Sequence, residues 1–199
     1  MSYVQHTQTV TERFDKHHGQ LIDIWNDTGK APTKCQTGDI YENLVMNVTE
    51  CLELDNRKQR LDVSSGGYST GIEADNIIFD KHGEPVCVVE CKTYLDACFL
   101  KRFVMDAVLM CESFPDLEFR IVSGQNALSD GAYEYYQRHF ESLTGKTFKT
   151  YYVLDMGYDN PDKKRASGQT ELYKNLGYDL DQNVLVEFIQ DLKETCRIG

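Results

Sequence analysis

Residues 71–92 read GIEADNIIFDKHGEPVCVVECK, and this stretch decides how the central sheet is expected to form. Residues 72–79 and 85–94 are rich in Ile, Val and aromatic side chains, which is typical of strands. Between them Asp80-Lys81-His82-Gly83 has the composition of a tight turn, so the stretch predicts a β-hairpin. The apolar run at residues 86–89 predicts that the second strand is buried.

The second strand ends in charged residues that a buried strand seldom carries. Glu90 and Lys92 stand two positions apart, so their side chains point to the same face. Counted back from the turn, Asp75 on the first strand is expected within about one residue of the level of Glu90. Glu73 faces the same way and is the alternative to Asp75, which we favour because apolar residues follow it.

Two carboxylates at one level of neighbouring strands make a pocket of hard oxygen ligands, which suits Mg²⁺. Such an ion can lower the pKa of a bound water and neutralise charge that develops on phosphorus. Lys92 could then orient or deprotonate the attacking water, or stabilise the developing charge. The alternative is a structural ion pair, Glu90–Lys92 or Asp75–Lys92, in a metal-free fold.

The pattern resembles the PD-(D/E)xK nucleases, and among them the type II restriction endonucleases. The resemblance covers about residues 39–123, as a helix, a hairpin carrying D…ExK, a further helix and a strand. It implies that Asp75 and Glu90 bind the metal, that Lys92 acts at the attacking water, and that the Cys91 carbonyl is a further metal contact. It also implies Glu42, on the first core helix, as a ligand or a neighbour of one; the alternative is a solvated helix residue or a partner of the helix dipole. The chain departs from the family pattern at Ala74, where the family often has Pro.

Apolar periodicity predicts the remaining elements. Helices are expected over residues 9–26, 39–54, 95–114, 130–143 and 183–196, and further strands over 60–65, 118–123 and 148–154. This order predicts an α/β fold, with a mixed central β-sheet flanked by helices in a restriction endonuclease-like core. We expect a single nuclease domain over residues 1–199, with its core at about 39–154, an irregular loop at 155–176 that could contact DNA, and a C-terminal helix at 183–196.

The charge of the chain opposes nucleic-acid binding as a whole. Its 199 residues carry a formal net charge of −11, which repels a phosphate polymer. Attraction to DNA must therefore come from local basic clusters and bound cations. The predicted DNA-binding residues are Arg57, Lys58, Arg60, Lys163, Lys164 and Arg165.

The sequence as a whole predicts a Mg²⁺-dependent endonuclease that hydrolyses phosphodiester bonds of double-stranded DNA, as a type II site-specific enzyme. One catalytic site per domain would need a homodimer to cut both strands, and two-fold symmetry implies a palindromic target. A structure-selective or repair nuclease stays open, as does a non-catalytic DNA-binding or assembly protein with a nuclease fold. No signal sequence or membrane-length apolar run is present, so a cytoplasmic protein without a membrane partner is expected.

Overall fold

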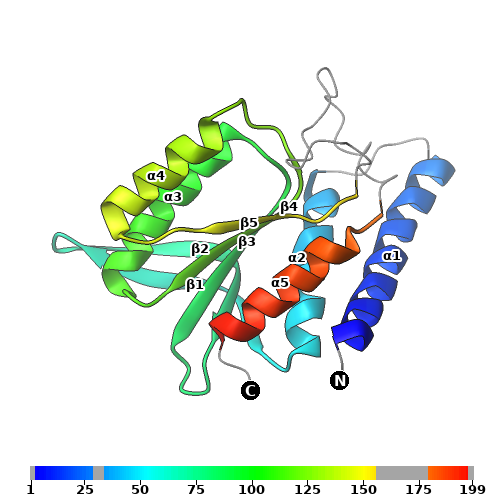
Figure 1. Cartoon of the computed structure of the whole chain (residues 1–199), viewed down its shortest axis with the longest axis horizontal. Coiled ribbons are helices and arrows are strands. Elements are labelled where there is room, and N and C mark those ends of the chain that lie inside the picture. Colours follow the sequence, from blue (N-terminus) through cyan, green and yellow to red (C-terminus); the bar gives the residue numbers. More distant parts are fainter. Residues whose placement is uncertain (1–2, 29–33, 156–178, 197–199) are drawn as a thin grey trace.

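The computed structural model describes residues 3–28, 34–155 and 179–196. Within these ranges five helices and five strands follow one another along the chain (Figure 1). Their order is α1 (Tyr3–Thr28), α2 (Lys34–Cys51), β1 (Asp55–Ser65), β2 (Tyr68–Phe79), β3 (Pro85–Leu95), α3 (Ala97–Ser113), β4 (Glu118–Asn126), α4 (Ala132–Thr144), β5 (Lys149–Tyr152) and α5 (Gln182–Thr195).

The strands form one mixed sheet in the order β1-β2-β3-β4-β5. Short turns join β1 to β2 and β2 to β3, and both pairs are antiparallel. The pairs β3–β4 and β4–β5 are parallel, which requires crossover connections, and the helices α3 and α4 supply them. The predicted α/β class, with a mixed sheet flanked by helices, is thereby confirmed.

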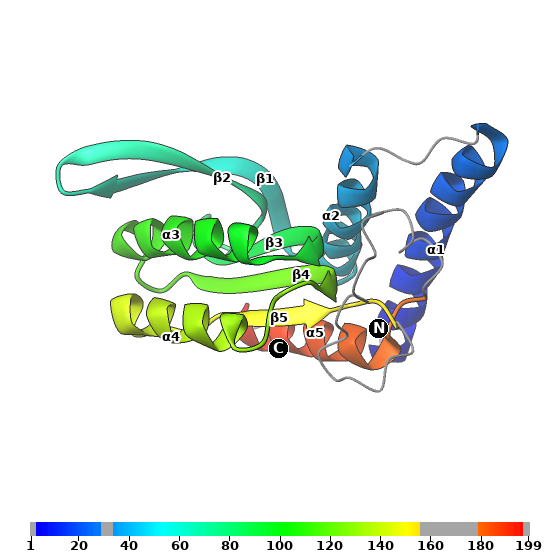
Figure 2. The same ribbon diagram turned by 90° about the horizontal axis from the view of Figure 1, so that it is seen from above.

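The helices cover both faces of this sheet (Figures 1 and 2). On one face α3 and α4 pack over an aromatic core in which the rings of Phe103 and Phe140 each contact both Phe119 and Phe148. On the other face α1, α2 and α5 enclose a second apolar cluster. Because α3 directly follows β3 and runs back across the sheet, it covers the face of β3 that carries Val88, Glu90 and Lys92.

Several elements extend further than the apolar pattern predicted. Strand β1 begins at Asp55 and not at residue 60. The apolar pattern did not reveal its first residues because they are polar and show no alternation. The connection between the strands predicted at residues 60–65 and 72–79 is only a two-residue turn. Gly66 and Gly67 have φ of 57° and 84°, as a type I′ hairpin turn requires, and Tyr68 already pairs with Ser65. Helix α1 likewise begins at Tyr3, before the predicted start at residue 9.

The pairing of β1 with β2 contains a bulge that bears on the candidate site. Arg57 pairs with Ile77, but Gln59 pairs with Ala74. Lys58 alone therefore lies opposite the two residues Asp75 and Asn76. A bulge of this kind bends the strand and changes the direction of its side chains, and such bulges are frequent next to active sites.

Candidate active site

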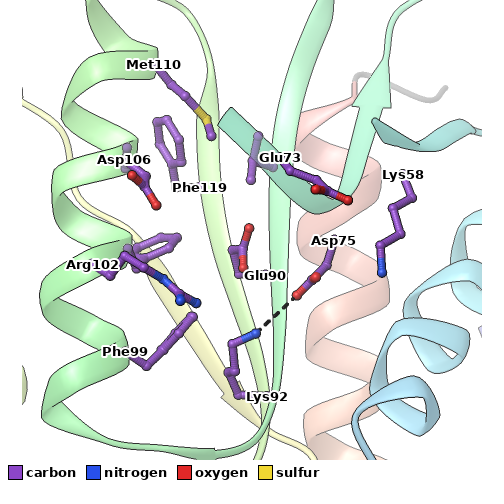
Figure 3. Close-up of a pocket in the computed structure, with 13 residues that line it drawn as sticks. Lys58, Glu73, Asp75, Glu90, Lys92, Phe99, Arg102, Asp106, Met110 and Phe119 are labelled. Atoms are coloured by element: carbon purple, nitrogen blue, oxygen red, sulfur yellow. Dashed lines mark ion pairs between the residues drawn. The ribbon is translucent and has the colours of Figure 1, made fainter. Parts of the chain in front are cut away.

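The hairpin β2–β3 places Asp75 beside Glu90, as its sequence predicts. The last ladder pair of these strands is Asn76–Val89, so Asp75 is one step further on, at the level of Glu90. The ladder does not continue to Cys91, and its backbone N–H donates instead to Asp75 Oδ2 at 2.9 Å. The same Oδ2 lies 3.5 Å from Lys92 Nζ (Figure 3). The Asp75 carboxylate therefore links β2 to β3 just beyond their last ladder pair.

Asp75, Glu90 and Lys92 open into a cavity of about 270 Å³ between the sheet and α3. Figure 3 shows Glu90 at its centre, with Lys92 and Asp75 on one side and α3 on the other. The Phe99 ring, on the first turn of α3, lies 4.9 Å from Lys92 Nζ. The complete lining is Lys58, Glu73, Asp75, Val88, Glu90, Lys92, Phe99, Arg102, Phe103, Asp106, Ala107, Met110 and Phe119.

The electrostatics of the cavity are dominated by two close carboxyl groups. Burial, and next the negative charge of Asp75, raise the pKa of Glu90 above its ordinary value, while Lys92 acts in the opposite direction. The side chains of Asp75 and Lys92 are only 17% and 30% exposed, so water screens these charges weakly. An arrangement of this kind favours either a shared proton or a bound cation.

The donor set fits Mg²⁺ if water and substrate complete the coordination. Across the described residues, no three His, Cys, Asp or Glu side chains gather closely enough to hold a metal ion by themselves. Mg²⁺ usually keeps several waters and takes one or two carboxylates together with substrate phosphate oxygens. Asp75 and Glu90 supply such a pair, and their mutual repulsion is what a cation would relieve. The Cys91 carbonyl as a further contact stays a prediction.

A chain of buried polar side chains supports the bulge from behind the site. Asn76 is 1% exposed, and its Oδ1 accepts from Asn56 Nδ2 at 2.8 Å. Asn56 Nδ2 also donates to Thr49 Oγ1 at 3.0 Å, and Asn76 Nδ2 donates to Cys91 Sγ at 3.5 Å. The chain thus links α2, β1, β2 and β3 at the level of Asp75. Burial raises the pKa of the Cys91 thiol, which stays neutral and is no nucleophile.

Two predicted residues meet at the edge of the cavity. Lys58, opposite the bulge, donates to Glu42 Oε2 on α2 at 2.7 Å, and this bond raises the pKa of Lys58. Lys58 lines the cavity, whereas Glu42 does not. Glu42 therefore reaches the site through Lys58, and its role as a metal ligand stays a prediction. Glu73 does line the cavity, but the contacts to Cys91 and Lys92 belong to Asp75.

Two other predicted DNA-binding residues, Arg57 and Arg60, contact groups of the protein itself. Arg57 forms an ion pair with Asp55 and lies 4.7 Å above the Phe79 ring. The Arg60 side chain lies against Gly71, where an added Cβ would clash with it. The cluster at residues 163–165 and most of the predicted loop at 155–176 lie outside the described residues.

Sequence reasoning missed the contribution of α3 to the site. Arg102 and Asp106 both line the cavity from this helix, and both are drawn in Figure 3. A signal for them was present, since the two charges stand four residues apart on a mostly apolar helix and so share one face. Burial raises the pKa of Asp106, and Arg102 opposes that shift.

Comparisons with known proteins add no assignment, since no protein-family model and no curated protein matches the chain. In the described part of the chain, no helix is long and apolar enough to cross a membrane.

Proposed function

We propose that the protein is a Mg²⁺-dependent nuclease that hydrolyses phosphodiester bonds of DNA. The observation that carries the proposal is the convergence of Asp75, Glu90 and Lys92 in one recessed cavity, with Asp75 joined to both Cys91 N–H and Lys92. The element order α2, β2–β3, α3, β4 also agrees with the order on which the resemblance to the PD-(D/E)xK nucleases rests.

In the proposed reaction water attacks phosphorus in line with the leaving oxygen. The new P–O bond forms as the bond to the 3′ oxygen breaks, which leaves a 5′-phosphate and a 3′-hydroxyl. The water loses a proton to solvent, and the leaving oxygen takes one up. Asp75 and Glu90 would hold Mg²⁺, which when bound neutralises charge on the phosphate and activates water. Lys92 donates a hydrogen bond to the attacking water or to a non-bridging phosphate oxygen.

Two forms of this activity are open. The first is a type II restriction enzyme, which acts on double-stranded DNA as a homodimer with one site per subunit. The second is a structure-selective or repair nuclease, and one observation favours it: the carboxylates lie inside a cavity and not on an open surface. A non-catalytic DNA-binding protein would keep the fold without turnover.

The test is cleavage of plasmid and single-stranded DNA with Mg²⁺, read on a gel. We expect Asp75→Asn, Glu90→Gln and Lys92→Ala each to abolish cleavage. The matched control is Lys81→Ala, which removes the same charge from the exposed turn of the same hairpin. Discrete plasmid fragments would identify a restriction enzyme. Intact DNA with Mg²⁺ and with Mn²⁺ would refute the nuclease and support the binding protein.

A further inference from the structure

Two walls flank the cavity. One wall is α3, and the other is the bulged β1–β2 hairpin. Figure 2 shows this hairpin projecting alongside α3. A hydrogen bond joins the two walls: the backbone N–H of Ser64 on β1 donates to Ser113 Oγ on α3 at 2.9 Å. Met110 lines the cavity one turn before Ser113.

The cavity is too small to enclose a base-paired segment, and a duplex could only lie across its mouth. A sphere of 270 Å³ is about 8 Å across, whereas the major groove of B-DNA alone is about 12 Å wide. The reactive groups are low in this space, since the Asp75 side chain is 17% exposed. An unpaired strand can carry a phosphate further into this space than a duplex that lies across its mouth.

The lining is divided in a way that matches a nucleotide. One part of the cavity holds Glu90, Lys92 and Asp75, and a phosphodiester would be hydrolysed there. Phe99, Phe103 and Met110 supply apolar lining from α3; all three are buried, and Phe99 is the most exposed of them at 8%. The Phe99 ring is already flanked by cations, with Arg102 Cζ at 5.9 Å and Lys92 Nζ at 4.9 Å from its centre. Aromatic rings and nearby cations are the usual platform for an unpaired base and its phosphates.

Two further carboxylates line the cavity and are available to a base edge. Glu73 on β2 and Asp106 on α3 both line the cavity, and Figure 3 shows them on opposite sides of it. Carboxylates accept hydrogen bonds from the amino groups of bases. Neither is bonded to Lys92 or to the Cys91 backbone, so neither is needed to build the catalytic pair.

We propose that the cavity takes one unpaired nucleotide, so that the substrate is a DNA strand with an end, flap or gap and not a continuous duplex. The proposal rests on the nuclease function and chooses between its two forms. Separation of the strands then precedes cleavage, and a base that is already unpaired enters at least cost.

Three DNA substrates of the same sequence test this with the full chain and Mg²⁺: a relaxed, covalently closed circle, a duplex with an unpaired tail, and a single strand. We expect the tail and the single strand to be cut at least tenfold faster than the circle. A circle cut as fast as the tail would overturn the proposal and leave the nuclease function standing. Absence of all cleavage would refute the nuclease function, and the cavity is then judged by binding.

The binding measurement uses the Lys92→Ala variant with Ca²⁺ and a single strand that contains the fluorescent base 2-aminopurine. Entry of the base beside Phe99 should change its fluorescence, and the paired duplex should give no change. Equal signals from both, or none from either, would overturn the proposal.

The substitution Phe99→Leu keeps apolar volume but removes the aromatic face, so KM for the single strand should rise about tenfold as stacking is lost. The matched control is Phe140→Leu, the same change in the same core but outside the cavity. An equal rise of KM in both variants would show that Phe99 is only structural.

Discussion

Substitution of Asp75 separates its structural role from its chemical role. Asp75→Ala removes the acceptor of the buried Cys91 N–H, which is bonded at 2.9 Å. An unsatisfied buried donor costs about 1–3 kcal/mol of unfolding free energy. For a chain of this length, each kcal/mol of unfolding free energy changes the melting temperature by about 2–4 °C. The melting temperature should therefore fall by roughly 2–12 °C. Asp75→Asn keeps an oxygen at that position and should stay within about 1 kcal/mol of the wild type.

Both variants should lose cleavage to the same extent, by roughly a thousandfold, because each removes a negatively charged metal ligand worth several kcal/mol in the transition state. Thermal unfolding followed by circular dichroism in EDTA measures the first effect, and cleavage of labelled DNA measures the second. Equal melting temperatures for the alanine and asparagine variants would refute the structural role of Asp75. Retained cleavage by Asp75→Asn would refute its chemical role.

Three further predictions follow from the charged groups. Asp191→Ala should lower the free energy of unfolding by about 3–5 kcal/mol in urea titrations, because it leaves the buried Arg120 guanidinium without its main partner; a loss below about 1 kcal/mol would contradict this. The metal-free protein should lose stability as pH rises from the ordinary pKa of a Glu towards the raised pKa of Glu90, because the folded state holds that proton more tightly. A plot of melting temperature against pH should therefore fall over this range and become flatter with Mg²⁺. A melting temperature that rises with pH would have the wrong sign. Lys58→Ala should lower the slope of log affinity against log salt by ~1, and an unchanged slope in titrations of labelled DNA would show that Lys58 contacts no phosphate.

The hairpin that carries Asp75, Glu90 and Lys92 was predictable because its geometry is local. Alternation along a strand fixes Glu90 and Lys92 on one face, and the short turn fixes the level of Asp75 to within a residue. The bulge escaped this reasoning, since it depends on how β1 pairs with β2 and shows in no apolar pattern. The first residues of β1 were missed for a related reason. They lie at the edge of the sheet and are polar, so nothing in them alternates.

The rest of the site depends on contacts between distant segments. The bond from Lys58 to Glu42 joins β1 to α2 across sixteen positions, and no spacing rule predicts it. Arg102 and Asp106 line the cavity only because the crossover of α3 returns over β3. The charge pattern of the helix could have indicated a shared polar face. It could not have indicated that this face lines the same cavity as Glu90.

The extra residue in β2 also affects how the sequence can change. Deletion of one residue at the bulge would let β2 pair with β1 without interruption. The same deletion would shift every side chain on one side of it by one position relative to the other. Asp75 and Glu90 would then no longer meet. Ile72 and Ala74 before the bulge and Ile77 and Phe79 after it are buried in the same core, so the shift would also turn one of these pairs away from that core. The extra residue therefore serves the packing of the sheet as well as the meeting of Asp75 with Glu90.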